Sequence, residues 1–359
     1  MSLTAATRRS ARPSADGSCR PDGVEIRFWR CGDTPRINAL YNDPAARPDA
    51  GGRHAFARST SQWEWEFASR RPHDPPYAVA VHGGGIIGIQ GYIPIELLYD
   101  GRTLLSGKDE DTLVHPAFRG RGVLDDLYGL LLGRARAEEV ALLWGFTSTA
   151  VRPLLRNGYR CVGSFDALRA EVANLRESRS KPGLEGVRIE PLLEPDKRCG
   201  RFSLAFARQV GGMTLHLSPE FLRWRVMENP FRRHMMFAAL REERIVGIGI
   251  FKVEDPEGMG CVSDLAALDD RGCSSASIQN ALLDAGVRTF KREGLRAIEA
   301  RPSGPHPYNQ QLRRLLLGRG FVEVHPRHAP QFMVLPVVGE HSAALDMASW
   351  RICELMREY

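Results

Sequence analysis

The chain has 359 residues, of which 43% are hydrophobic and 26% are charged, a composition that can bury the cores of two domains. No apolar run reaches the ~18–20 residues of a membrane-spanning helix, so we expect no membrane association. The formal net charge is +6, but the arginines are mixed with acidic residues and no basic run is interleaved with aromatic residues. This pattern argues against nucleic-acid binding and favours a basic groove for an anionic ligand.

Cysteine usage and the N-terminal segment indicate a compartment. The seven cysteines are scattered, without a C-x-x-C pair. This spacing favours reduced thiols in a cytoplasmic protein over a disulfide framework or a zinc site, and we expect no metal. Residues 1–23 are rich in Ser, Ala, Arg and Pro and contain no apolar signal core. They are therefore predicted to be a disordered tail and not a secretory signal.

The chain after residue 24 alternates between strand and helix patterns. A strand is expected at 24–29, and a helix follows Asp33, whose side chain is a candidate cap. The stretch STSQWEWEF at 59–67 fits a strand or a short helix capped by Ser61. An antiparallel meander is then predicted, with strands at 77–81, 86–98 and 103–114 joined by turns at Gly83–Gly85 and Asp100-Gly101.

The most informative stretch is 109–135, DEDTLVHPAFRGRGVLDDLYGLLLGRA. The pattern predicts a strand that ends at His115-Pro116, a turn with two glycines and two arginines, and a helix from Val123. A glycine turn that leads into a helix presents unpaired backbone N–H groups, and the helix dipole favours negative charge there. The sequence therefore predicts a site for a phosphate or pyrophosphate.

The remainder of the first half completes an α/β pattern. A buried parallel strand is expected at 141–146, a helix at 151–156 that stops at Asn157-Gly158, and a closing pair of strands at 159–165 and 167–172. Residues 24–173 are thus predicted to form one domain with a mixed, mostly antiparallel sheet flanked by helices.

A second, related half follows. Trp65 and Trp224 are 159 residues apart, and Ile87-Gly88-Ile89 and Val246-Gly247-Ile248 share this offset. We expect a linker at 174–186 and a second domain at 187–359, which ends in an amphipathic helix at 342–358. Where the first half has two glycines, the second has Asp269-Asp-Arg-Gly-Cys-Ser-Ser-Ala. The second copy is therefore predicted to be degenerate and not to bind the anion productively.

The spacing Arg119-x-x-Gly122-x-Leu124 after V-x-P resembles the acyl-CoA pyrophosphate loop of the GNAT superfamily of N-acyltransferases, and the element order resembles that fold from residue 24 to 172. The resemblance implies two tandem GNAT-like domains and acetyl-CoA as co-substrate. It places the pantetheine arm on backbone groups of Leu113 and Val114. It assigns the pyrophosphate to the turn formed by Arg119, Gly120, Arg121, Gly122, Val123 and Leu124.

Direct transfer to an amine needs a group that accepts a proton, usually a carboxylate. Asp109, Glu110 and Asp111 enter the apolar strand before the turn, and strict alternation places Asp109 and Asp111 on one face. We expect Asp111, and with less support Glu110 or Asp109, to act as the base. Many superfamily members use a tyrosine four residues before the glycine that follows the last helix, but this chain has Leu154 there.

The predicted reaction is acetyl transfer from acetyl-CoA to a primary amine of a small molecule such as an amino sugar. Trp63 and Trp65 are candidates for stacking on that acceptor, with core packing as the alternative. Three alternatives remain open: a protein or peptide amine as acceptor, an acyl group longer than acetyl, and a non-catalytic acyl-CoA-binding module. The oligomeric state is not indicated by any pattern in the sequence.

Overall fold

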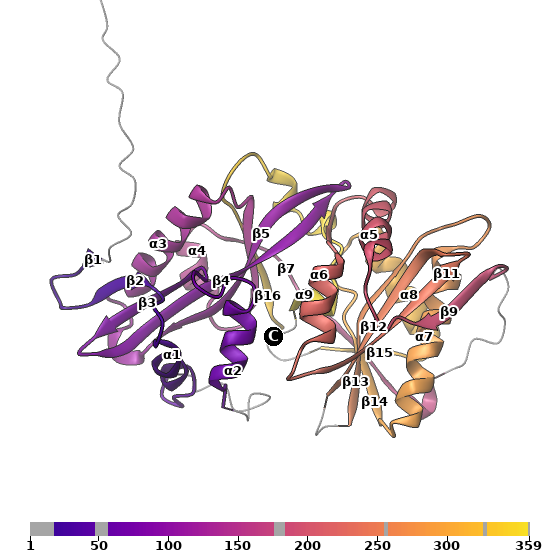
Figure 1. Ribbon diagram of the computed structural model, residues 1–359, viewed down its shortest axis with the longest axis horizontal. Helices are drawn as coiled ribbons and strands as arrows, with labels where there is room; N and C mark the ends of the chain where they lie inside the picture. The colour runs from indigo at the N-terminus through magenta and orange to yellow at the C-terminus, as the bar shows by residue number, and fades with distance from the viewer. Residues whose placement is uncertain (1–17, 47–56, 176–183, 255–257, 326–328, 358–359) are drawn as a thin grey trace, which may run out of the picture. The chain divides into compact units, whose positions relative to one another are not determined.

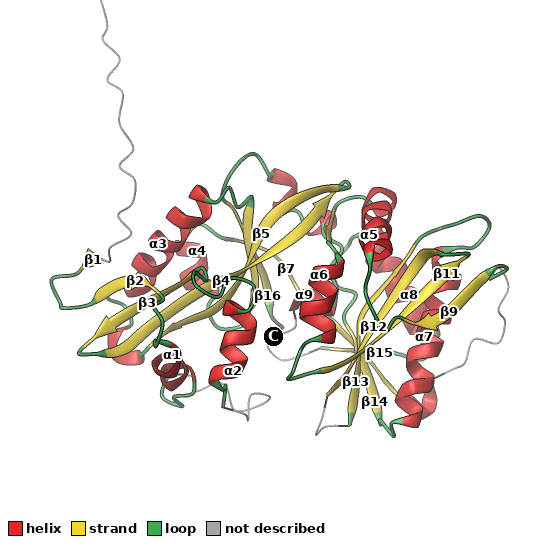
Figure 2. Ribbon diagram, viewed as in Figure 1, coloured by secondary structure: helices red, strands yellow, loops and turns green. Residues whose placement is uncertain are grey.

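The computed structural model describes residues 18–46, 57–175, 184–254, 258–325 and 329–357. These residues form a mixed α/β fold with two sheets, each mostly antiparallel and each with helices packed against it (Figures 1 and 2). The predicted fold class is confirmed. The chain divides into two compact units, Met1–Ile93 with Glu110–Glu138, and Pro94–Asp109 with Glu139–Tyr359. Most of the expected linker at 174–186 lies outside the described residues, so a domain boundary there stays a prediction.

The first sheet has strand order β1-β2-β3-β4-β5-β6-β16-β7, with β10 paired to β4. Its one parallel pair is β5 with β6 in the described chain. The bounds are β1 Ser18–Cys19, β2 Glu25–Phe28, β3 Tyr77–His82, β4 Gly85–Tyr99, β5 Arg102–Val114, β6 Leu142–Thr147, β7 Arg160–Ser164, β10 Met213–Leu215 and β16 Gln331–Pro336.

The second sheet has strand order β15-β8-β14-β13-β12-β11-β9. Helix α7 packs on β11, β12 and β13, and its apolar face fills the core of this sheet. The bounds are β8 Ala167–Glu171, β9 Val187–Pro191, β11 Arg233–Arg241, β12 Arg244–Glu254, β13 Met259–Ala267, β14 Ala297–Ala300 and β15 Val322–Val324.

The helices and shorter turns connect these strands (Figure 2). The α-helices are α1 Thr34–Tyr41, α2 Thr60–Trp63, α3 Val123–Ala137, α4 Val151–Arg156, α5 Lys197–Val210, α6 Pro219–Leu222, α7 Ser275–Arg292, α8 Pro307–Gly318 and α9 Glu354–Arg357. Two π-helical turns are η1 Glu64–Ala68 and η4 Arg223–Met227, and the 3₁₀ turns are η2 Pro116–Phe118, η3 Val172–Asn174, η5 Ser342–Leu345 and η6 Met347–Ser349.

The predicted closing pair of strands is wrong. β7 belongs to the first sheet, where it pairs with β16 from near the C-terminus. β8 pairs instead with β14 and β15 in the second sheet. β16 lies between β6 and β7, with Met333 and Val334 fully buried. Each sheet is therefore completed by a strand from the other half of the sequence.

The predicted repeat is visible in matching hydrogen bonds and close contacts. The His115 N–H donates to the Ile87 carbonyl, and the Leu268 N–H donates to the Val246 carbonyl in the second copy. A Cβ on Gly88 would lie 3.2 Å from Val123 and Leu127 of α3. A Cβ on Gly247 would lie 2.7 Å from Ile278 of α7. Both glycines let a helix approach the sheet closely.

Three local expectations need correction. The stretch at 59–67 forms α2 followed by η1, and its cap is Ser59, which accepts from the Gln62 N–H, and not Ser61. The stretch at 342–358 is not one helix but two 3₁₀ turns, an extended segment and α9. Residues 18–19, expected in the tail, form β1 against β2.

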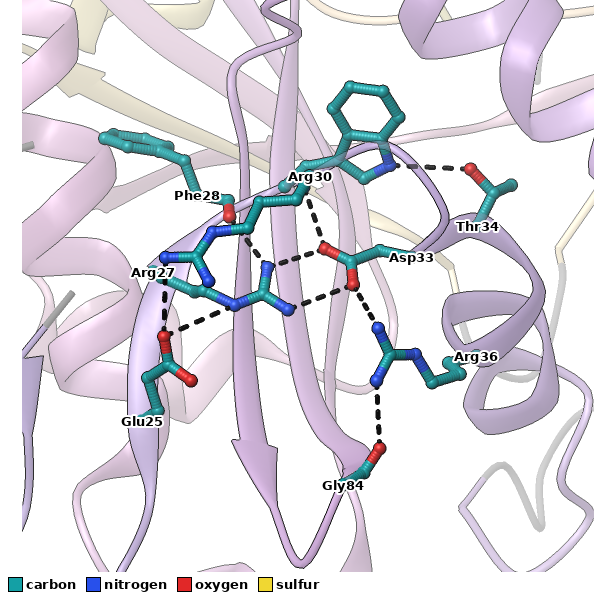
Figure 3. A network of polar contacts seen from close by, with 9 residues as sticks. Glu25, Arg27, Phe28, Arg30, Asp33, Thr34, Arg36 and Gly84 are labelled. Atoms are coloured by element: carbon teal, nitrogen blue, oxygen red, sulfur yellow. Dashed lines mark hydrogen bonds and ion pairs between the residues drawn. The ribbon is translucent and has the colours of Figure 1, made fainter. Parts of the chain in front are cut away.

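A buried ion pair fastens β2 to α1 (Figure 3). Arg27 donates from Nη1 and Nη2 to the two carboxylate oxygens of Asp33, at 2.6 and 3.0 Å. Asp33 occupies the N-cap position of α1 but makes no side-chain capping bond. Its carboxylate accepts instead from the Arg30 N–H and from Arg36. Burial opposes ionisation, but the bonds from Arg27 and Arg30 outweigh it and lower the pKa of Asp33.

Removing Arg27 should destabilise the fold strongly, because Asp33 would keep its charge in a buried site without its main partner. We expect Arg27→Ala to cost about 3–5 kcal/mol of unfolding free energy in a denaturant titration. The control is Arg36→Ala, which removes a half-exposed partner of the same carboxylate and should cost about 1 kcal/mol or less. Equal losses in the two variants would contradict this assignment.

The strand exchange predicts that residues 1–173 do not fold alone, because the buried strand β6 lacks its neighbour β16. That fragment should show no cooperative thermal transition. The same fragment with residues 329–338 appended through a flexible Gly/Ser linker should regain one. A cooperative transition in the unextended fragment, measured by circular dichroism, would contradict the exchange.

Candidate functional site

The turn between β5 and α3 depends on two glycines in left-handed backbone. Gly120 has φ = 75° and Gly122 has φ = 80°. A Cβ on Gly120 would meet nothing within 4 Å, so the requirement is one of conformation and not of packing. Residues with a Cβ are disfavoured in this region by roughly 1–2 kcal/mol. The glycines therefore set the direction in which the chain enters α3.

The start of α3 is open to an anion. Gly122 is the N-cap and has no side chain that could accept from the first N–H groups of the helix. The first backbone bond of the helix runs from the Asp126 N–H to the Gly122 carbonyl. Among the described residues, no side chain accepts from the N–H groups of Val123 or Leu124. These donors and the positive end of the helix dipole form the kind of site that binds phosphate groups.

The matching helix of the second copy is closed. Ser274 caps α7 by accepting from the Ser277 N–H at 3.1 Å. The Asp269 carboxylate accepts from the Ser275 N–H at 2.6 Å. Two donors of this helix terminus are thus used internally, and a carboxylate lies where a phosphate would otherwise bind. That only the first copy binds the anion stays a prediction.

Arg20 lies against the turn, although its segment was expected to be part of a disordered tail. Its Nη1 is 2.6 Å from Asp126 Oδ2, and its Nη2 donates to the Arg121 carbonyl at 2.5 Å. Asp125 and Asp126 would otherwise repel an anion at the first turn of α3. Arg20 offsets one of those charges and holds the turn at Arg121.

The two arginines of the turn have different roles. Arg119 donates from Nε to the Val114 carbonyl at 2.8 Å and from Nη2 to the Ala46 carbonyl at 2.7 Å. Its side chain therefore holds the turn together and is not directed at a ligand. Arg121 is exposed, with its guanidinium carbon 5.4 Å from the centre of the Phe118 ring. Arg121 is the turn arginine that remains accessible to an anion.

Strand β5 loses its parallel partner before it reaches the turn. The ladder with β6 pairs Ser106 with Leu142 and ends with Lys108 opposite Trp144 in the described chain. Alternation from the His115 N–H bond to β4 directs the backbone groups of Leu113 toward β4 and those of Val114 toward the other edge. An extended amide-bearing arm could pair with such an edge. This geometry favours Val114 over Leu113 as the backbone contact.

Asp111, the expected base, accepts two hydrogen bonds on one carboxylate oxygen. Arg58 Nη1 and the Tyr77 hydroxyl both donate to its Oδ2, each at 2.5 Å. Burial alone would lower the pKa of Arg58, but the Asp111 carboxylate outweighs it and raises that pKa above its usual value. Asp111 has φ = 61°, so the strict alternation assumed for this strand is wrong at this residue.

Asp109 has a different environment. It is 9% exposed, and its Oδ2 accepts a very short hydrogen bond from the Tyr159 hydroxyl. Its Oδ1 is buried and has no hydrogen-bond partner among the described residues. Burial raises the pKa of Asp109 to about 8, against the Tyr159 hydrogen bond and the Lys108 charge, which both lower it. Of the two aspartates, Asp111 forms an ion pair with Arg58, whereas Asp109 forms none among the described residues.

The other candidates are less favourable. Glu110 is buried, and its carbonyl accepts from Gln90 at 3.4 Å. Trp63 cannot stack on an acceptor, because it is fully buried against Trp29, Phe67 and Tyr77. Trp65 is half-buried in η1 and stays a prediction.

The described residues show neither a metal-binding cluster nor a helix fit to span a membrane. No group of three or more His, Cys, Asp or Glu side chains is arranged to hold a metal ion. No helix in the described ranges is long and apolar enough to cross a membrane.

Comparisons with known proteins agree with this geometry. Residues 52–162 match the family model described as an acetyltransferase (GNAT) domain. No curated protein matches the chain. Residues 52–162 are thus similar to a GNAT acetyltransferase domain, in line with the sequence resemblance.

Solved structures extend the likeness to nearly the whole chain. A GCN5-related N-acetyltransferase from Anabaena variabilis has a TM-score of 0.61 at 12% identity, over 88% of this chain and 73% of that one. One from Kribbella flavida has a TM-score of 0.58 at 17% identity, over 88% and 72%. A tandem GNAT protein from the clavulanic acid biosynthesis pathway has a TM-score of 0.55 at 14% identity, over 89% and 100%. The fold is that of tandem GNAT proteins.

The buried Asp109 carboxyl should make stability depend on pH. Its pKa is about 3.9 in an unfolded chain and about 8 in the fold, so the folded state holds a proton that the unfolded chain releases. This contribution is fully present below about pH 4 and is lost as pH rises through 8, by at most about 1.4 kcal/mol per pH unit. Asp109→Asn should therefore become more stable relative to the unmodified protein from pH 5 to pH 9. A difference in unfolding free energy that does not change with pH would contradict this environment.

Proposed function

We propose that the protein is an N-acyltransferase that moves an acetyl group from acetyl-CoA to a primary amine of a small molecule, such as an amino sugar, by direct attack on the thioester. The observation that carries the proposal is the contrast between the two helix N-termini. The start of α3 is uncapped behind two left-handed glycines, whereas the start of α7 is capped by Ser274 and Asp269.

The residues of the first copy fit the phosphates of a CoA thioester. The N–H groups of Val123 and Leu124 supply donors, and Arg121 supplies an exposed positive charge. Arg20 holds the turn and offsets Asp126. The edge of β5 at Val114 offers the Val114 N–H to a pantetheine carbonyl, because the Val114 carbonyl already accepts from Arg119. No metal is needed for this binding, because the donors are backbone N–H groups and arginines.

A small-molecule acceptor is favoured by one relative, a tandem GNAT protein from the clavulanic acid biosynthesis pathway. The test is CoA release from acetyl-CoA with glucosamine, putrescine and a peptide with a free N-terminus as acceptors. Turnover with glucosamine or putrescine supports the proposal. Turnover with the peptide alone would replace the small-molecule acceptor, and binding of acetyl-CoA without any turnover would indicate a non-catalytic module.

Gly122→Ala should weaken acetyl-CoA binding, because a Cβ is disfavoured at φ = 80° and the turn must change to relieve it. A loss of 1–2 kcal/mol in the turn corresponds to about 5–30-fold in the dissociation constant measured by calorimetry. The matched control is Gly129→Ala in the middle of α3, where a Cβ would meet nothing within 4 Å. That variant should bind acetyl-CoA normally and gain about 0.5–1 kcal/mol in stability. Equal binding by the two variants would refute the assigned loop.

A further inference from the structure

We propose that Asp109 is the base of the acyl transfer and that Tyr159 is its positioning residue, a buried pair that the first copy contains and the second copy replaces. This inference rests on the proposed function and identifies the proton-transfer machinery of the same site. No sequence motif pointed to the hydroxyl of Tyr159.

The two oxygens of the Asp109 carboxylate have different surroundings. The Tyr159 hydroxyl donates to Oδ2 of Asp109, which fixes the carboxylate plane, while Oδ1 is buried with no partner among the described residues. A buried polar atom without a partner is costly in a purely structural site, because it loses its hydrogen bonds to water and gains none. A carboxylate held on one oxygen and free on the other is arranged to accept a proton.

Gly145 of β6 lies directly beside Asp109. A Cβ on Gly145 of β6 would lie 3.1 Å from the Asp109 Cβ and 3.2 Å from the Asp109 carbonyl oxygen. The parallel ladder ends one residue earlier, at Lys108 and Trp144. Gly145 thus makes space for Asp109 where the two strands stop pairing. Asp109 lies on the same strand as Val114, five residues before the predicted pantetheine contact.

The second copy has apolar residues at the positions equivalent to Asp109 and Tyr159. The equivalent hydrogen bonds place Leu268 at the position of His115, so Asp109 corresponds to Val262. The Tyr159 N–H donates to the Leu154 carbonyl, as the Phe321 N–H does to the Leu316 carbonyl. Val262 and Phe321 are both buried in the apolar core of the second sheet. The fold therefore accepts apolar residues at both positions, and the acid and the hydroxyl are present only in the copy with the open helix terminus.

The other aspartate of the strand is used differently. Asp111 is paired with Arg58, and its counterpart Asp264 is paired with Arg351, so an acid at that position is bound by an arginine in both copies. A shared ion pair in both halves indicates a structural role. Asp109 forms no ion pair within 4 Å among the described residues, and the charged or titratable groups that act on it are Tyr159 and its neighbour Lys108.

In the proposed reaction, the amine proton passes to Asp109 and CoA leaves as the thiolate. The nitrogen of the neutral amine attacks the thioester carbonyl carbon, which forms the C–N bond. The proton on that nitrogen passes to Oδ1 of Asp109, and the C–S bond breaks to release the CoA thiolate. The carboxyl then returns the proton to the thiolate or to water, which regenerates the carboxylate.

The experiment compares the unmodified protein with Asp109→Asn, Tyr159→Phe and a matched control, Tyr128→Phe, which removes another fully buried tyrosine hydroxyl. The pH dependence of kcat is measured with acetyl-CoA and the best acceptor of the amine panel. Protonation of the Asp109 carboxyl is followed by infrared difference spectra against Asp109→Asn. Acetyl-CoA affinity is measured by calorimetry, and folding is checked by thermal melting.

We expect kcat of the unmodified protein to rise with pH through a value near 8. Asp109→Asn should lose about 10²-fold or more in kcat and lack that rise. Tyr159→Phe removes the hydrogen bond that favours the carboxylate, so both the kinetic and the infrared transitions should move up by about one pH unit. Tyr128→Phe should leave both transitions in place. All four proteins should bind acetyl-CoA equally.

Unchanged transitions in a folded Tyr159→Phe variant that binds and turns over acetyl-CoA would overturn the role of Tyr159. Full activity of Asp109→Asn would overturn the role of Asp109. Failure of the unmodified protein to bind acetyl-CoA would instead refute the proposed function, and with it the catalytic role. In that case the infrared titration would still decide whether the two residues are coupled.

Discussion

The left-handed backbone at Gly120 and Gly122 is the constraint on which the site depends. It lets the chain pass from β5 to α3 in a tight turn that leaves the first N–H groups of the helix uncapped. The two arginines of this turn have different roles. Arg119 fastens the turn to Val114 and Ala46, and Arg121 stays exposed. The same connection in the second copy uses Ser274 and Asp269 to satisfy its own helix terminus. The two copies thus differ at the helix N-terminus: its N–H groups are uncapped in the first copy and bonded to side chains in the second.

The strand exchange explains why the second half is retained although its helix terminus is closed. β16 fills the place between β6 and β7, and β8 fills the place beside β14. Neither sheet is complete without a strand from the other half of the sequence. Strand β7, which begins directly after Tyr159, precedes its partner β16 by about half of the chain. The position of the Asp109–Tyr159 pair is therefore supported by residues that carry no chemistry.

Local signals in the sequence predicted the local structure well. Asp100-Gly101 has positive φ at both residues and joins β4 to β5 as expected. The periodic apolar residues from Val123 give α3, and the 159-residue offset places Gly88 and Gly247 beneath equivalent helices. The predictions failed where the interacting residues are distant in the sequence. No local pattern distinguishes a β8 that pairs with β7 from one that pairs with β14, and a helical pattern at 342–358 is overruled by tertiary contacts. Tyr159 and Arg20 could not be found for the same reason, since their partners lie 50 and 106 residues away in the sequence.

The central claim is that a single copy binds the CoA thioester. Calorimetric titration of the full chain with acetyl-CoA tests it most directly, because the number of sites is measured independently of the acceptor and of catalysis. An uncapped α3 and a capped α7 predict one molecule of acetyl-CoA per chain. A stoichiometry of two would contradict the closed second copy, and no binding would contradict the assigned site itself.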